Sequence, residues 1–220
     1  MKSKKKNIAA PQLSHDLQMH DLSVLEDEER YEGMLFEETV FDGSCSKFIT
    51  FEELRLVRVA FRNAEIHSAK LVNVRFENCD LSNSNWPKLT LKRVEFVNCR
   101  MTGMRMPDSR LTDVLIQDCK CDLLQAPMSK ISSARFQSSN FSETDFRHAN
   151  LEDLEFSRCS LAAAEFYDAK FKNVDFRSST IEGIKIQPEN WRGAIIDSQQ
   201  LITIASELAN RWGIEIDDTN

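Results

Sequence analysis

The chain has 220 residues, of which 41% are hydrophobic, and its 35 acidic residues outnumber its 28 basic residues to give a formal net charge of −7. No apolar run approaches the roughly 18 residues of a membrane-spanning helix. No hydrophobic stretch follows the early lysines, as it would in a signal peptide. These features predict one domain that lies in the cytoplasm and has no membrane partner.

Residues 1–30 are expected to be a lead-in to the folded part of the chain. The start is basic and predicted to be disordered. Its lysines are Lys2, Lys4, Lys5 and Lys6. Scattered leucines in the acidic stretch 16–29 predict an irregular first coil or cap.

Residues 31–196 carry a repeat with a period of five. Every fifth residue from Tyr31 onward is large and apolar with three exceptions, and every phenylalanine except Phe48 lies at one of these positions. The exceptions are Ser46, Cys121 and Ala126. Neither a helix nor a plain strand has this period. Each five-residue unit therefore predicts one side of a squared coil, with two inward and three outward positions.

Two sets of residues indicate that four units make one coil. Each set has a spacing of 20 residues, which stacks its members along the coil axis. The sets are Pro87, Pro107 and Pro127, and Cys79, Cys99 and Cys119. The repeat then predicts about eight coils, with the cysteines used as small buried residues. Small bulges are expected at Ser46 and at 121–126, where the pattern is least regular.

Residues 146–156 and 169–176 resemble the A-(D/N)-L-x-x unit of pentapeptide-repeat proteins. The resemblance extends over 31–196 without a break in register. It implies an all-β fold, a right-handed quadrilateral parallel β-helix, followed here by a C-terminal α-helix. The handedness agrees with that of parallel crossover connections in general.

Residues 197–220 change period and predict a helix with a tail. Apolar residues at helical spacing define one face over 197–212. They are Leu201, Ile204, Ala205, Leu208 and Trp212. Asp197 or Ser198 is the expected N-cap, and Gly213 suits the position that follows a helix. Ile214 and Ile216 predict a short terminal strand.

The stretch 193–216 is similar to the C-terminus of the Qnr/MfpA-type proteins, a bacterial group linked to quinolone resistance. The similarity implies a homodimer, with the five apolar helix residues named above as its contacts. The alternative is a helix that only covers the open end of the solenoid, because terminal repeats must be capped. Both roles are compatible.

The sequence predicts a protein without enzyme activity, because nucleophile-elbow, phosphate-loop and zinc motifs are missing. No catalytic, cofactor or metal residues are expected. The Qnr/MfpA-type similarity implies a binder of type II topoisomerase, such as DNA gyrase, that imitates DNA. Such imitation needs an acidic surface in place of phosphates, whereas charges of both signs occur on every face of the coils. The acidic stretch 197–218 is the best remaining candidate.

The alternative function is a scaffold for protein–protein interaction, with no direct contact to nucleic acid. One side of the predicted coils carries exposed aromatic, methionine and proline residues, which partner surfaces favour. The candidate surface consists of Phe48, Pro87, Pro107, Pro127, Met128 and Tyr167.

Overall fold

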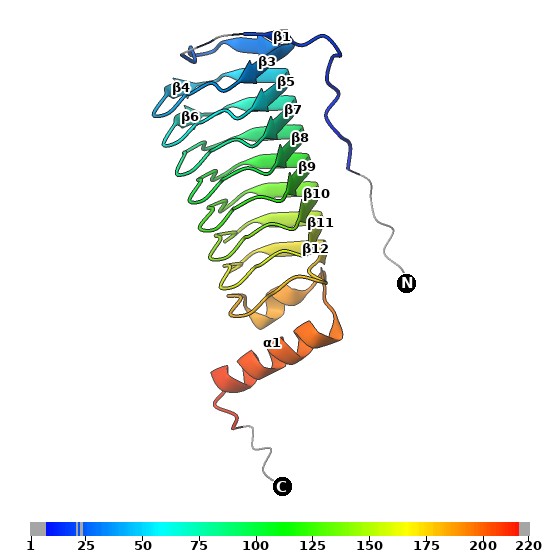
Figure 1. Cartoon of the computed structure of the whole chain (residues 1–220). Helices are drawn as coiled ribbons and strands as arrows, with labels where there is room; N and C mark the ends of the chain where they lie inside the picture. The colour runs from blue at the N-terminus through cyan, green and yellow to red at the C-terminus, as the bar shows by residue number, and fades with distance from the viewer. Residues whose placement is uncertain (1–7, 21, 23, 216–220) are drawn as a thin grey trace.

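The computed structural model describes residues 8–20, 22 and 24–215, which form a rod of stacked coils with one helix at its C-terminal end (Figure 1). The fold is the expected right-handed quadrilateral parallel β-helix. It has about nine coils, more than the repeat predicted, because Gln18–Met19, which precedes the repeat, pairs with the first coil. The expected disordered start at 1–7 lies outside the described residues.

The strands pair in parallel, mostly with a shift of 20 residues from one coil to the next. They are β1 (Gln18–Met19), β2 (Arg30–Glu32), β3 (Met34–Glu37), β4 (Cys45–Lys47), β5 (Thr50–Val57), β6 (Glu65–His67), β7 (Lys70–Glu77), β8 (Thr90–Val97), β9 (Arg110–Gln117), β10 (Lys130–Gln137), β11 (Asn150–Ser157), β12 (Lys170–Asp175) and β13 (Ala194–Ile195). A 3₁₀ helix, Pro188–Trp191, and α1, Ser198–Arg211, complete the chain.

The rod has four faces, each named here after its inward residue in the first complete coil. The eight-residue strands bend at their middle and cover two of them, the Tyr31 face and the Phe36 face. Isolated parallel bridges such as Ala60 with Asp80 form the Phe41 face. β4, β6 and further bridges form the Ser46 face.

The inward residues of the five-residue repeat form one continuous core. Their rings contact one another from coil to coil, stacked in the pair Phe76 and Phe96 at 4.7 Å and edge to face in the pair Phe136 and Phe156 at 5.3 Å. The bulges expected at Ser46 and 121–126 are absent: Ser46 is buried and pairs with Ile66, and Cys121 and Ala126 are buried as well. The parallel backbone hydrogen bonds hold the register even where the inward side chain is small.

One backbone feature was not foreseen. In almost every unit, the second residue after the inward position has a positive φ, between 46° and 65° for residues other than glycine. This left-handed conformation turns the chain at each corner of the coil. Asparagine, aspartate and glycine tolerate it best, and these residues fill many of the corners.

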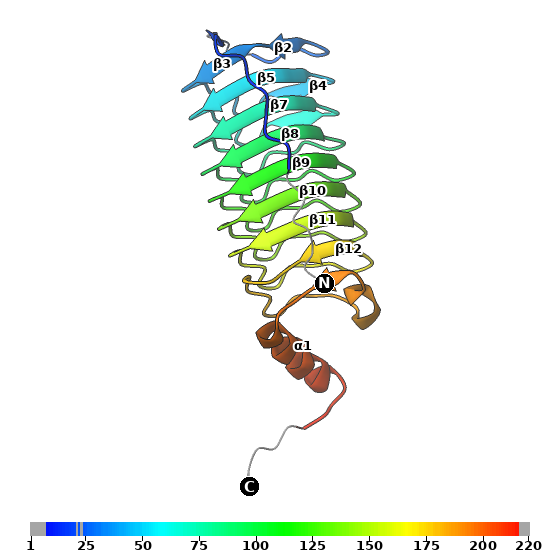
Figure 2. The same cartoon turned by 90° about the vertical axis from the view of Figure 1, so that its right-hand side faces the viewer.

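The lead-in forms part of a first coil and a strap along the outside of the rod. Leu25 is buried, and the Glu26 N–H donates to the Tyr31 hydroxyl. Before β1, the chain runs back across the middle of the long strands (Figure 2). The Gln12 N–H donates to Asn73 Oδ1 at 3.2 Å, and the Ala9 N–H donates to Asp113 Oδ1 at 3.4 Å.

Candidate functional site

The six residues of the predicted partner surface lie along a single corner of the rod, between the Ser46 face and the Tyr31 face. Backbone hydrogen bonds join their coils in an unbroken series, from the Phe48 N–H to the His67 carbonyl at 2.8 Å through to the His148 N–H to the Tyr167 carbonyl at 2.9 Å. We call Phe48, Pro87, Pro107, Pro127, Met128 and Tyr167 the corner stripe. Residues separated by 119 positions in the sequence are therefore brought into one line.

Two members of the corner stripe occupy left-handed corners although their side chains are bulky. Phe48 has a φ of 58° and Met128 also has a φ of 58°. Both are more than half exposed. Because a left-handed residue with a Cβ costs roughly 1–2 kcal/mol and an exposed side chain recovers little of it by burial, neither residue is explained by stability alone.

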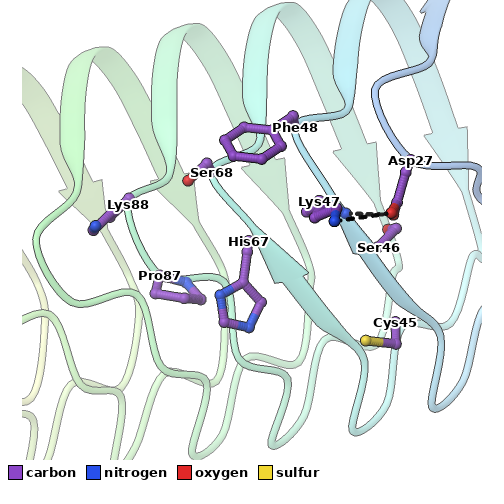
Figure 3. Close-up of a pocket in the computed structure, with 9 residues that line it drawn as sticks. All are labelled: Asp27, Cys45, Ser46, Lys47, Phe48, His67, Ser68, Pro87 and Lys88. Carbon is purple, nitrogen blue, oxygen red and sulfur yellow. Dashed lines mark hydrogen bonds and ion pairs between the residues drawn. The ribbon is translucent and has the colours of Figure 1, made fainter.

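A surface pocket of about 520 Å³ lies at the N-terminal end of the corner stripe (Figure 3). The Phe48 ring stands on one side of it, and the His67 and Pro87 rings lie on the other. At its rim, the Asp27 carboxylate accepts a hydrogen bond from the Lys47 N–H at 3.0 Å and faces its ammonium group at 3.6 Å. The pocket is lined mostly by apolar atoms, with charged groups at its edge.

Helix α1 covers the C-terminal end of the rod. Asp197 is its N-cap: Asp197 Oδ1 accepts from the Gln200 N–H at 2.9 Å, and Gln200 Oε1 accepts from the Asp197 N–H at 3.1 Å. This reciprocal arrangement is a capping box. After the helix, Gly213 has a φ of 70° and the Ile214 N–H returns to the Ala209 carbonyl, as expected of a glycine-terminated helix. Ile214 is not in a strand, and Ile216 lies outside the described residues.

The structure divides the five predicted dimer contacts into two groups. Ile204, 8% exposed, and the partly buried Leu208 pack against the end of the rod, where they line a hollow of about 320 Å³ with Tyr167 and Trp191. In contrast, Leu201 is 57% exposed, Trp212 is 64% exposed and Ala205 is also exposed. Apolar residues lie on both sides of α1. Their helical spacing therefore did not predict which of them the rod covers.

The acidic residues of the Phe36 face are largely neutralised by arginines of neighbouring coils. Arg55 Nε donates to Glu77 at 2.8 Å, and Arg58 Nε donates to Glu38 at 3.0 Å. Arg75 bridges Glu77 and Glu95. The hydrogen bond from Arg55, supported by Arg75, holds the pKa of Glu77 below its ordinary value, although partial burial acts in the opposite direction. This face is a network of ion pairs rather than an acidic stripe.

The stacked cysteines have the character of core residues. Cys79, Cys99 and Cys119 are buried, and the Cys99 N–H donates to the Cys119 sulfur at 3.3 Å. Hydrogen bonds with the Cys119 and Cys79 thiols, together with burial, raise the pKa of Cys99 far above its ordinary value, which leaves the thiol protonated and a poor nucleophile. Within the described residues, no three histidine, cysteine or acidic side chains are grouped to hold a metal ion.

The five-residue repeat and the squared coils define a solenoid in which each coil contacts only its neighbours. The sequence model of the "Pentapeptide repeat region" family matches residues 69–125 and 119–186. The chain belongs to the pentapeptide-repeat family. None of the helices in the described residues is long and apolar enough to cross a membrane.

Several solved structures have a related shape. One is HetL of the cyanobacterium Nostoc sp. strain PCC 7120, a pentapeptide-repeat protein involved in heterocyst differentiation regulation, with 13% identity, 77% of this chain and 85% of that chain covered, and a TM-score of 0.45. Another is full-length QnrB1, a plasmid-mediated fluoroquinolone resistance protein, with 18% identity, coverage of 90% and 99%, and a TM-score of 0.33. A third is the pentapeptide-repeat protein Rfr23 of the cyanobacterium Cyanothece 51142, with 16% identity, coverage of 60% and 64%, and a TM-score of 0.19. No curated protein matches the sequence. Likenesses this distant do not assign a partner.

Proposed function

We propose that the protein is a non-enzymatic, cytoplasmic scaffold whose corner stripe binds an extended segment of a partner protein. The supporting observation is the combination of exposed Phe48 and Met128 in left-handed corners with the pocket beside Phe48. Exposed aromatic and methionine side chains are enriched in partner interfaces. The half-buried prolines between them offer flat apolar surface without a backbone donor.

The dimensions of the corner stripe suit a short extended peptide. Six coil-to-coil steps separate Phe48 from Tyr167, which at about 4.8 Å a step gives about 29 Å, or about nine residues of extended chain. The pocket of about 520 Å³ accommodates one large apolar side chain as an anchor. The partner we infer is therefore an extended segment with an aromatic or large aliphatic residue near one end.

A random peptide display library tests this proposal directly. We expect the selected peptides to share an apolar anchor. They should bind the Phe48→Ala variant at least tenfold more weakly than the wild type. Leu123→Ala is the matched control, because Leu123 is also bulky, about half exposed and left-handed but lies off the corner stripe. Failure to select any peptide, or equal losses with the two variants, would refute the proposal.

We also propose that two copies associate through the outward side of α1, with Leu201, Ala205 and Trp212 as contacts and Ile202 beside them. These apolar residues are exposed. Because α1 covers the C-terminal end of the rod, a second copy can approach them along the rod axis. Leu201→Glu is expected to halve the mass seen by sedimentation at micromolar concentration without lowering the melting temperature. A wild-type monomer at those concentrations would leave α1 as a cap only.

A second candidate function is binding to a type II topoisomerase, which rests on the similarity of 193–216 to the Qnr/MfpA-type proteins. The ion pairs of the Phe36 face speak against DNA imitation by that face, and Asp197 is engaged as the cap of α1. The test is supercoiling by DNA gyrase with increasing protein, with and without ciprofloxacin. Inhibition or rescue from the drug at micromolar protein supports this candidate, and no effect with folded protein rejects it.

A further inference from the structure

The Tyr31 face carries positive charges that no acidic side chain neutralises. Five of its outward cations on β7 to β12 are called the basic face here: Lys70, Lys92, Arg110, Lys130 and Lys170. Two more cations lie on the same face, where Arg93 donates to Asn73 Oδ1 and Lys172 is paired with Glu152. All five residues of the basic face are exposed. Across the described part of the chain, none of them forms an ion pair, whereas Arg55, Arg58 and Arg75 on the adjoining Phe36 face all do.

The strand register arranges these cations in line. Lys70 pairs with Thr90, Thr90 with Arg110, Arg110 with Lys130, Lys130 with Asn150 and Asn150 with Lys170. At about 4.8 Å a step, four cations are distributed over about 24 Å along the rod axis. The residues between them are hydrogen-bond donors rather than acids, so that the whole line is suited to an anionic ligand.

Three acidic side chains lie on the same face beside this line, and each has a partner. Asp153 accepts a hydrogen bond from Asn173 Nδ2 at 2.8 Å. Asp113 accepts the Ala9 N–H of the strap, and Glu152 is paired with Lys172 at the edge of the face. A shallow hollow of about 390 Å³ lies between Lys130, Lys170 and Asn150. The paired Glu152 and Lys172 also line it. With that carboxylate already paired, the Lys130 and Lys170 ammonium groups and the Asn150 amide are available to an oxyanion.

We propose that the basic face binds the phosphate backbone of duplex nucleic acid, along the rod axis and without regard to sequence. The linear spacing of the cations matches a regular polyanion better than a single anion. The exposed Met128 and Tyr167 lie at the bordering corner, and the outward residues of the Tyr31 face from β7 to β12 include no exposed aromatic side chain. The face itself therefore lacks the stacking platform that single-stranded nucleic acid uses and the large apolar side chains that insert into a lipid surface.

This proposal is independent of the corner stripe and departs from the expectation of no direct nucleic-acid contact. That expectation accompanied the scaffold interpretation, and the chain as a whole has a net charge of −7. The stack segregates the charge: on the Phe36 face Arg55, Arg58 and Arg75 are paired with acids, whereas the five cations of the basic face form no ion pair within the described residues. A local field of one sign can attract a polyanion although the molecule as a whole is acidic.

Fluorescence polarisation with a labelled duplex DNA of about 30 base pairs tests the proposal. With about four phosphate contacts, affinity should fall about 150-fold between 50 and 200 mM salt. In the double variant Lys130→Ala/Lys170→Ala, two contacts are lost, and the fall should shrink to about 12-fold. Duplexes of different sequence should bind equally.

Arg100→Ala/Lys120→Ala is the matched control. It removes two exposed cations from adjacent coils on the Phe41 face, which lies on the opposite side of the coil from the basic face. This control should bind DNA and respond to salt as the wild type does. All variants must melt within 2–4 °C of the wild type, a window that corresponds to about 1 kcal/mol.

Three outcomes would overturn the proposal. The first is no saturable binding to duplex DNA at 50 mM salt. The second is an equal loss of binding in the control and the basic-face variants. The third is binding to vesicles of phosphatidylserine and phosphatidylcholine without binding to duplex DNA, which would assign the face to anionic lipid.

Discussion

Replacing Phe156 by alanine should remove more stability than almost any other conservative change in this chain. Phe156 is fully buried. Its ring lies 5.3 Å from the rings of Phe136 and Phe176, and 5.9 Å and 6.5 Å from those of Phe141 and Phe146. It therefore joins three consecutive coils.

The magnitude follows from the contacts. A buried Phe→Ala change costs about 3–5 kcal/mol. We expect the upper end, about 5 kcal/mol, because the neighbouring rings cannot close the gap without leaving the hydrogen-bonded register of the coils. For a domain of this size, that corresponds to a fall in melting temperature of about 10–20 °C.

Phe48→Ala is the matched control, since it makes the same chemical change at a residue that is 56% exposed. The expected loss is about 1 kcal/mol, or about 2–4 °C. Thermal unfolding followed by circular dichroism at a common scan rate gives both values. If Phe156→Ala were no more harmful than Phe48→Ala, the reasoning from ring stacking in the core would be wrong.

Three further variants test other parts of the molecule. Ala163→Asn should raise stability by about 0.5–1 kcal/mol, because Ala163 has a φ of 57° and asparagine tolerates that conformation better; a lower melting temperature would contradict this. Gln200→Ala should cost about 2–3 kcal/mol, because its amide donates to the buried Phe176 and Ser179 carbonyls at 2.6 and 2.8 Å; an unchanged melting temperature would show that α1 does not need it. Because the folded pKa of Glu77 is lowered, its ion pairs stabilise the fold fully above the ordinary value of 4.5 and are lost as pH falls through the folded value. Glu77→Gln should therefore lose less stability than the wild type on acidification below pH 4.5, and parallel pH profiles would argue against this contribution.

The sequence was sufficient for the fold and for the alignment of the corner stripe. The period of five predicted which residues point inward. The spacing of 20 between Pro87, Pro107 and Pro127 predicted that these prolines lie in one line. Both deductions work because each coil repeats the geometry of the last. The left-handed corners were missed because they hold residues as different as Asn83 and Leu123, so no single residue type marks them.

The ion pairs of the Phe36 face and the orientation of α1 depend on contacts that the five-residue repeat does not encode. Arg55 and Glu77 are 22 residues apart and meet only because they lie in adjacent coils. From the sequence, their face read as mixed charge, and which of its charges are paired was not visible. The orientation of α1 was equally hidden, because Ile204 and Leu201 are both apolar and only the end of the rod distinguishes them.

The left-handed corner in each unit makes the surface sensitive to the length of the chain in a particular way. Each five-residue unit turns the chain by one side, so an insertion or deletion of five residues leaves the core pattern intact but rotates everything beyond it onto the next face. The corner stripe and the basic face would both be cut at that point, although the protein would still fold. A duplication of 20 residues would instead lengthen both surfaces by one coil. Pentapeptide repeats of this kind can thus tolerate many length changes as folds but only whole-coil changes as binding surfaces.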